Sequence, residues 1–355
     1  MKTHVLERLQ RIPQWLRNKY APGALILLYH RVADTSLDPH LLSVTPRHFA
    51  EHLDVLRKHY RPMSLQQLAQ ALRERKSIGR VVVVTFDDGY ADNLYNAKPL
   101  LERFDIPATV FVPTESVGQV FEAWRGELER VLLRPGTLPK ILSLSVDGKT
   151  QHWDLGESAL YTDEVYKDHR GWNFFAEIDP SPRHSLYRAL YLLLRPMPED
   201  KQQDVLDQVL AWANLEPIRD SPHRSLSPAE VFRLAKDGLV EIGSHAMTHT
   251  PLVALSASAQ REEIQRSKND LEEMSGRPVV SFAYPFGLPT DYNEDAVALV
   301  KEAGYKCACA ATTGVVGPSA DTYQLQRLTV GNPHTMTGEW DGEAFAGVMR
   351  WMIGK

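Results

Sequence analysis

Two adjacent carboxylates follow a run of four valines. The segment VVVVTFDDG (81–89) places Asp87 and Asp88 directly after a stretch that strongly favours a β-strand. Because Asp-Gly is also a common turn pair, the two aspartates could simply form a turn or cap a helix. Carboxylates at the end of a buried strand are also where α/β enzymes place reacting groups. The other motifs of the chain have to separate these two interpretations.

Two histidines follow another apolar run. LVEIGS (239–244) leads directly into HAMTH, which contains His245 and His249. If the chain becomes helical here, a spacing of four residues puts both imidazoles on one face. With 13 histidines in the chain, such a pair alone is a weak signal. Together with a carboxylate, however, two histidines form a frequent catalytic zinc set that leaves one position open for water.

A pair of carboxylates beside a metal can divide the work of hydrolysis. One aspartate stays ionised and coordinates the cation, while the other accepts a proton from the attacking water as general base. His30 follows a third apolar run, ALILLY (24–29). Catalytic residues of barrel enzymes come from the carboxyl ends of several strands. These groups are therefore expected to meet at one end of a barrel.

Short apolar runs alternate with amphipathic segments along most of the chain, which is typical of a parallel sheet or barrel. The predicted strands are 24–30, 81–86, 108–113, 239–245, 279–285 and 306–312. The predicted helices are 45–60, 64–77, 256–276 and 293–304. Thr45 and Pro46 suit the start of the first of these helices.

Residues 114–238 interrupt this alternation. They contain helix-like segments and SLSVDGKTQHWDL, which reads as a small hairpin with Asp-Gly at its turn. We predict a mostly helical insertion near the strand ends. Tryptophan side chains there could line a binding site, although tryptophan in a helical insertion more often packs in a core. The tryptophans in question are Trp124, Trp153, Trp172 and Trp212.

Three motifs resemble those of one family. TFDDG (85–89), HAMTH (245–249) and FAYPFG (282–287) are similar, in this order, to motifs of the polysaccharide deacetylase family, carbohydrate esterase family 4 with its NodB homology domain. The resemblance covers 24–113 and 239–332 and leaves the insertion outside. It implies a distorted (β/α) barrel of about seven strands. It also implies metal-dependent removal of an acetyl group from an N-acetylated amino sugar.

The resemblance implies roles for individual residues. Asp87 corresponds to the general base, and Phe286 to the residue whose backbone N–H binds the oxyanion. The implied metal ligands are Asp88, His245 and His249. Zinc is the expected metal, although this ligand set also accepts cobalt, nickel or iron. Candidate substrate-binding residues are Tyr29, Tyr284 and Trp124. The insertion is expected to shape the sugar site or to dock a lipid carrier, since aromatic faces suit sugar rings.

Two positions depart from the family pattern. The arginine that begins the third motif and orients the base is Ala283 here. Arg327 could reach the site from a neighbouring strand, or it could lie on the surface. The late general-acid histidine has no clear counterpart, since only His334 follows Arg327. Relatives with an FAYPFG-type motif tend to carry Tyr-His on the first strand, so His30 in LLYHRV resembles the general acid. A histidine of the core is the alternative.

Charge and composition exclude several functions. A net charge of −5 and a pI near 6.2 do not favour nucleic acid or an anionic membrane surface. Only one residue separates Cys307 from Cys309, which would strain a disulfide, so both are expected to be reduced. No stretch approaches the roughly 18 apolar residues that cross a bilayer.

The expected location of the protein is the cytoplasm. Residues 1–23 resemble an amphipathic helix that packs on the domain, and a peripheral contact with the inner membrane or a partner is the alternative. A cytoplasmic enzyme would act on a lipid- or nucleotide-linked glycan precursor rather than on a finished extracellular polymer. The sequence does not indicate an oligomeric state.

Two other functions stay open. The same metal set could hydrolyse an amide that is not part of a sugar. Alternatively, the barrel could bind glycans without catalysis. The missing motif arginine and late histidine favour that second alternative. The presence of all four polar residues of the first two motifs opposes it; these are Asp87, Asp88, His245 and His249.

Overall fold

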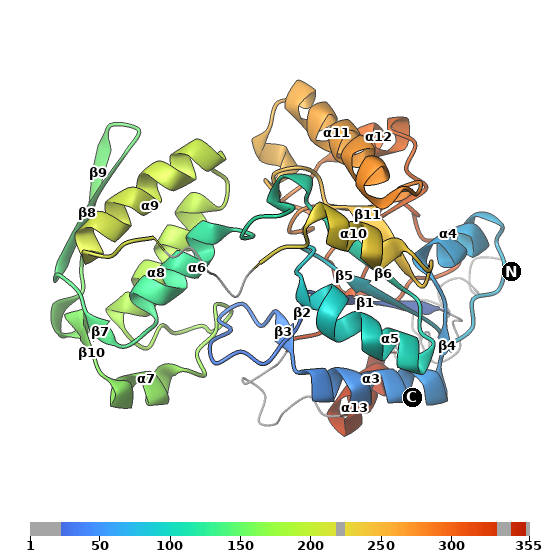
Figure 1. Cartoon of the computed structure of the whole chain (residues 1–355), viewed down its shortest axis with the longest axis horizontal. Coiled ribbons are helices and arrows are strands. Elements are labelled where there is room, and N and C mark those ends of the chain that lie inside the picture. Colours follow the sequence, from blue (N-terminus) through green and yellow to red (C-terminus); the bar gives the residue numbers. More distant parts are fainter. Residues whose placement is uncertain (1–22, 218–223, 332–341, 353–355) are drawn as a thin grey trace, which may run out of the picture.

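The computed structural model describes residues 23–217, 224–331 and 342–352. The predicted N-terminal helix, apart from residue 23, and His334 lie outside the described residues. A parallel sheet surrounded by helices forms one lobe, and a mostly helical lobe lies beside it (Figure 1). Among the described helices, none is both long and apolar enough to span a bilayer.

The main sheet is parallel throughout. Seven of its strands follow the order β13–β12–β11–β6–β5–β1–β14, and β4 pairs with β5 beside this path. The bounds are β1 Ala24–Tyr29, β4 Arg61–Pro62, β5 Val81–Phe86, β6 Ala108–Val112, β11 Val240–Ser244, β12 Ser281–Ala283, β13 Cys307–Cys309 and β14 Leu328–Thr329. Two short strands, β2 Arg31–Val32 and β3 Ser43–Val44, pair separately. All six predicted strands are present in this sheet, and β4 and β14 are additions to them.

The sheet curls until its two ends approach each other. An isolated parallel bridge joins Cys309 of β13 to Leu325, just before β14. The backbone N–H of Arg327 also donates to the carbonyl of Thr312 at 2.9 Å. Because β14 pairs with β1, these contacts nearly close the sheet. The prediction of a distorted (β/α) barrel of about seven strands with a mostly helical insertion is confirmed.

Capping residues explain where several barrel helices begin. The Thr45 hydroxyl accepts from the His48 N–H at 3.2 Å, and Ser64 forms a reciprocal capping box with Gln67. The predicted helix 256–276 ends, as expected, at a left-handed Gly276. The helices around the sheet are α3 Pro46–His59, α4 Leu65–Arg73, α5 Lys98–Phe104, α10 Pro228–Ala235, α11 Ala257–Ser275, α12 Glu294–Glu302 and α13 Gly342–Met352.

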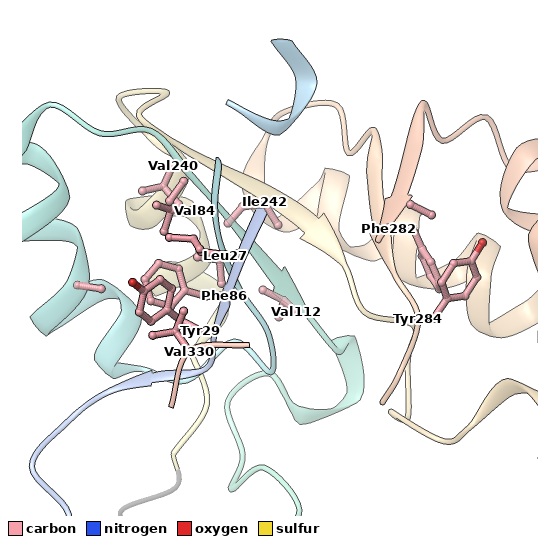
Figure 2. Packing of buried hydrophobic residues seen from close by; sticks show 14 of the residues in the cluster. Leu27, Tyr29, Val84, Phe86, Val112, Val240, Ile242, Phe282, Tyr284 and Val330 are labelled. Carbon is pink, nitrogen blue, oxygen red and sulfur yellow. The ribbon is translucent and has the colours of Figure 1, made fainter. Parts of the chain in front are cut away.

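Apolar side chains from neighbouring strands fill the barrel (Figure 2). Tyr29 packs against Phe49 and Phe86, with ring centroids 5.2 and 5.5 Å away. Strands that are apolar on both faces, such as β5, are buried on both sides, as parallel sheets require. The close-packed core therefore fixes the strands whose ends carry the polar motifs.

The insertion has a hydrophobic core of its own, and it lies to one side of the barrel (Figure 1). Its elements are α6 Ala123–Leu132, β7 Gly136–Thr137, β8 Ile141–Val146, β9 Lys149–Asp154, β10 Leu160–Tyr161, α7 Asp163–His169, α8 Pro182–Leu194 and α9 Glu199–Ala213. The hairpin that the sequence predicts is β8–β9. In contrast, Val231 and Leu234 of α10 pack in the barrel core. The predicted boundary at 238 is therefore too late.

Candidate metal and catalytic site

Three buried donors from two strand ends converge. Asp88 follows β5, and His245 and His249 follow β11. One donor atom of each residue lies within 4.8 Å of the others. The Nε2 atoms of His249 and His245 lie 3.5 and 3.8 Å from Asp88 Oδ1. The structure thus brings together the three side chains that the motifs single out as metal ligands.

Hydrogen bonds orient both imidazoles. Nδ1 of His245 lies 2.8 Å from the carbonyl oxygen of Ala283, and Nδ1 of His249 lies 2.9 Å from Oε1 of Glu122. If each Nδ1 carries the proton, each Nε2 lone pair faces Asp88. Oxygen acceptors behind metal-binding histidines have this effect in metalloproteins. Two imidazoles and one carboxylate in this arrangement fit a divalent cation such as zinc.

Electrostatics act in opposite directions on the two imidazoles. Burial would lower the pKa of His249, but the hydrogen bond to Glu122 and the charges of Asp88 and Glu122 outweigh it and raise that pKa. Burial lowers the pKa of His245 to about 4, even though the Asp87 carboxylate acts in the opposite direction. Burial would raise the pKa of Glu122, but the charge of Arg125 and the hydrogen bond to His249 outweigh it and lower the pKa to about 2. His245 is therefore neutral near pH 7, which is the form that binds a cation.

Several residues of the site have a left-handed backbone. Asp88, His249 and Phe286 have φ values of 70°, 60° and 59°. Such conformations are costly for residues other than glycine, and they tend to cluster at functional sites. Gly89 continues the turn after Asp88 at φ 61°, and a Cβ there would lie 3.0 Å from a methyl group of Val112. The turn that aims Asp88 at the histidines therefore needs glycine next to it.

A buried arginine holds Asp87. Nη1 and Nη2 of Arg327 donate to the two carboxylate oxygens, each at 2.7 Å. Nε of Arg327 donates to the carbonyl of Ala310 at 2.8 Å. Burial would raise the pKa of Asp87, but the charge and hydrogen bonds of Arg327 outweigh it and lower the pKa to about 2. Asp87 is therefore ionised and fixed in orientation.

The orienting arginine comes from a different strand than the family motif suggests. Arg327 precedes β14, which lies beside β1, and β1 lies beside β5 with Asp87 at its end. At the motif position, Ala283 contributes only its backbone carbonyl to His245. Arg327 has no exposed surface, so the alternative of a surface arginine is wrong.

A cavity of about 540 Å³ lies above these groups. It is lined by six of the predicted residues, namely His30, Asp87, Asp88, His245, His249 and Phe286. Nδ1 of His30 is buried and has no hydrogen-bond partner within the described part of the chain. A polar nitrogen in this situation is suited to meet a substrate, since an unpaired buried donor or acceptor is costly.

The insertion supplies groups that the motifs do not include. Arg125, Phe174 and Tyr191 line the same cavity. Arg195 also lines it, with its guanidinium 3.9 Å from the centre of the Phe286 ring. Nothing in the spacing of these residues along the sequence connects them with the barrel motifs. Only the position of the insertion in space shows that they belong to the site.

Two of the predicted substrate-binding residues do not reach the cavity. Tyr29 is fully buried in the barrel core, where its hydroxyl lies 3.2 Å from Nδ1 of His52 (Figure 2). Tyr284 is also fully buried and donates to the carbonyl of Tyr323 at 3.0 Å. The prediction that these two tyrosines bind substrate is wrong, because their side chains face away from the strand-end site.

For Trp124, the sequence predicts either contact with substrate or packing in a core. It belongs to the hydrophobic core of the insertion, and its ring lies 5.4 Å from that of Tyr191. It also lines a second cavity of about 380 Å³, which shares His249 and Arg195 with the first. Packing is therefore established for Trp124, and contact with a substrate stays a prediction.

Sequence comparison connects the chain with known deacetylases. The family model described as polysaccharide deacetylase matches residues 74–137 and 207–308. A poly-β-1,6-N-acetyl-D-glucosamine N-deacetylase of Escherichia coli is 34% identical over 96 residues, which cover 26% of this chain and 14% of that protein. The enzyme of the same name from Staphylococcus epidermidis is 27% identical over 129 residues, covering 33% and 43%. The match thus spans less than half the length of these curated relatives.

Solved structures share the fold over almost the whole chain. IcaB from Ammonifex degensii aligns with a TM-score of 0.56 and 18% identity, covering 94% of this chain and 97% of that one. A de-N-acetylase from Aggregatibacter actinomycetemcomitans aligns with a TM-score of 0.51 and 16% identity, covering 91% and 99%. The family model spans the segments that carry all three motifs, and the fold agrees with it. The chain is thus similar to polysaccharide deacetylases in the segments that carry its motifs and in its fold.

Proposed function

We propose that this protein is a metal-dependent N-deacetylase that hydrolyses the acetamido group of an amino sugar in a glycan or glycan precursor. One observation carries the proposal: a three-donor metal site lies beside an ionised, arginine-held Asp87 on the surface of one cavity. The names of the Escherichia coli and Staphylococcus epidermidis relatives support an N-acetylglucosamine-containing substrate.

The chain's own residues then have separate tasks. When bound, a divalent cation polarises the amide carbonyl and lowers the pKa of the attacking water. Asp87, held by Arg327, accepts a proton from that water. The Phe286 N–H donates to the carbonyl oxygen as negative charge develops there. His30 gives a proton to the amine nitrogen as the C–N bond breaks, which yields acetate and the free amino sugar.

The donor set and the cavity walls guide the finer assignments. Two imidazoles and one carboxylate suit zinc best, although cobalt, nickel or iron would also bind. Aromatic walls from Phe174 and Tyr191 suit the apolar faces of sugar rings. A lipid- or nucleotide-linked precursor as substrate stays a prediction. So do the cytoplasmic location and the membrane contact through residues 1–23.

Acetate release tests the function directly. The metal-loaded protein is expected to release acetate from N-acetylated glucosamine oligosaccharides faster than from small amides such as N-acetylated amino acids. Faster hydrolysis of the small amides would favour a hydrolase of non-sugar amides. Glycan binding without any acetate release would favour a barrel that binds glycans but has no catalytic activity. The contact between Arg327 and Asp87 removes one of the two observations that favoured that last alternative.

His30→Gln is expected to lower kcat for a sugar amide by about 10²–10⁴-fold, the usual contribution of a general acid. An amine leaves poorly without a proton, whereas 4-nitrophenolate leaves readily as an anion. Hydrolysis of 4-nitrophenyl acetate by the same variant should therefore change little. Equal losses on the two substrates would show that His30 does not act as the acid.

Arg327→Lys is expected to lower kcat by about 10–100-fold, the range found when residues behind a metal site are changed. Lysine keeps the positive charge but cannot form the paired hydrogen bonds that fix both oxygens of Asp87. Metal content should stay at the wild-type level, as elemental analysis can check. An unchanged kcat would show that the arginine only neutralises Asp87 and does not orient it.

A further inference from the structure

Glu122 connects the insertion with the metal site. It lies directly before α6, with a left-handed backbone (φ 41°). Its Oε1 lies 2.9 Å from Nδ1 of His249, and only 9% of its side chain is exposed. A residue other than glycine rarely adopts such a backbone unless the surroundings impose it. The chain thus enters the insertion in a conformation that aims this carboxylate at a candidate metal ligand.

The other oxygen of Glu122 is fixed from within the insertion. Nη1 of Arg125 donates to Oε2 at 2.6 Å, and both side chains are almost fully buried. Nη2 of Arg125 donates to the hydroxyl of Tyr90, two residues after Asp88. A buried carboxylate is tolerated only when it is paired in this way. Contacts therefore run from His249 through Glu122 and Arg125 to the turn that carries Asp88.

We infer that Glu122 is a positioning residue for His249, so that the insertion takes part in building the metal site. Its carboxylate holds the Nδ1 proton and the ring orientation that direct Nε2 toward Asp88, and it increases the basicity of the ligand. The inference depends on one part of the proposed function, namely that this site binds a metal. It assigns to the insertion, which lies outside the barrel motifs, a role in metal affinity.

Glu122→Ala is expected to weaken Co²⁺ binding by about 10–100-fold, the usual effect of removing a partner behind a metal ligand. Competition with a chromophoric chelator measures this affinity, and the visible Co²⁺ spectrum should change because His249 is no longer held. Glu122→Gln keeps an acceptor oxygen for His249 at the same reach but turns its amide NH₂ toward Arg125, so it should restore part of the affinity. Glu122→Asp keeps the charge near Arg125 but is one methylene too short, and it should bind as weakly as Glu122→Ala.

Glu127→Gln is the matched control. Glu127 lies on α6, which begins directly after Glu122; it is buried, pairs with Arg130 at 2.6 Å and does not line the catalytic cavity. Its replacement should leave Co²⁺ affinity and spectrum unchanged. Wild-type affinity and spectrum in Glu122→Ala or in Glu122→Asp, with a cooperative thermal transition, would overturn the inference. If affinity depends on Glu122 but the wild type releases no acetate, the proposed function fails and the inference stands.

Discussion

Asp87→Asn is expected to reduce kcat for N-acetylated glycans by about 10²–10⁴-fold while the protein keeps its metal. Asparagine has nearly the same shape as aspartate but cannot accept a proton from water. The three metal donors of the site do not include Asp87, so their arrangement should persist. Acetate release and elemental analysis of the same samples measure the two effects together.

Folding has to be checked in the same variant. Arg327 would lose its charge partner in a fully buried position, and breaking a buried ion pair typically costs about 3–5 kcal/mol. A lower thermal midpoint is therefore expected, and activity should be compared well below it. If folded Asp87→Asn retains full activity, Asp87 is not the general base.

Asp88→Ala is expected to remove both the metal and the activity. Asp88 supplies the one negatively charged donor among the three, and its oxygen faces both Nε2 atoms. Two neutral imidazoles alone bind a divalent cation much more weakly, because the charge of the carboxylate is lost. Acetate release should fall to the background rate, and added zinc should restore little of it.

Asp92→Asn provides a comparison for this variant. Asp92 lies four residues after Asp88, is mostly buried and pairs with Arg31 at 3.0 Å, but it does not line the catalytic cavity. It should lose some stability and keep its metal. Normal metal content in Asp88→Ala would mean that the cation, if present, binds elsewhere.

The strand ends could be predicted because local sequence determines them. The short run of β5, rich in β-branched residues, favours a buried strand, and Asp87 and Asp88 follow it without a gap. The apolar run of β11 likewise predicts a strand, and His245 follows it directly. Parallel strands direct their carboxyl ends to one side, so the convergence of these groups follows from the pattern.

The partners of these groups could not be predicted in the same way. Arg327 lies 240 residues from Asp87, and their contact depends on how far the sheet curls before β14 meets β1. Glu122 reaches His249 because the chain enters the insertion through a left-handed turn, and no local pattern predicts that turn. Such contacts depend on tertiary geometry that neither spacing nor periodicity encodes.

The two errors about tyrosines have different causes. Neighbouring residues of a strand point to opposite faces. If His30 faces the cavity, Tyr29 beside it is expected to face the core, as it does. Tyr284 lies just after β12, so this alternation does not apply to it; it packs against Tyr292, with ring centroids 3.9 Å apart. Proximity to a motif in sequence therefore did not indicate access to the site.

Metal content combined with acetate release tests the central claim most directly. Purified wild-type protein and the His245→Ala/His249→Ala variant would be compared by elemental analysis and by acetate release from N-acetylated glucosamine oligosaccharides. The account predicts about one metal ion per wild-type chain, and it predicts that the double variant loses both metal and activity. A wild type that binds no metal even after zinc or cobalt is added, or a double variant that still releases acetate, would contradict it.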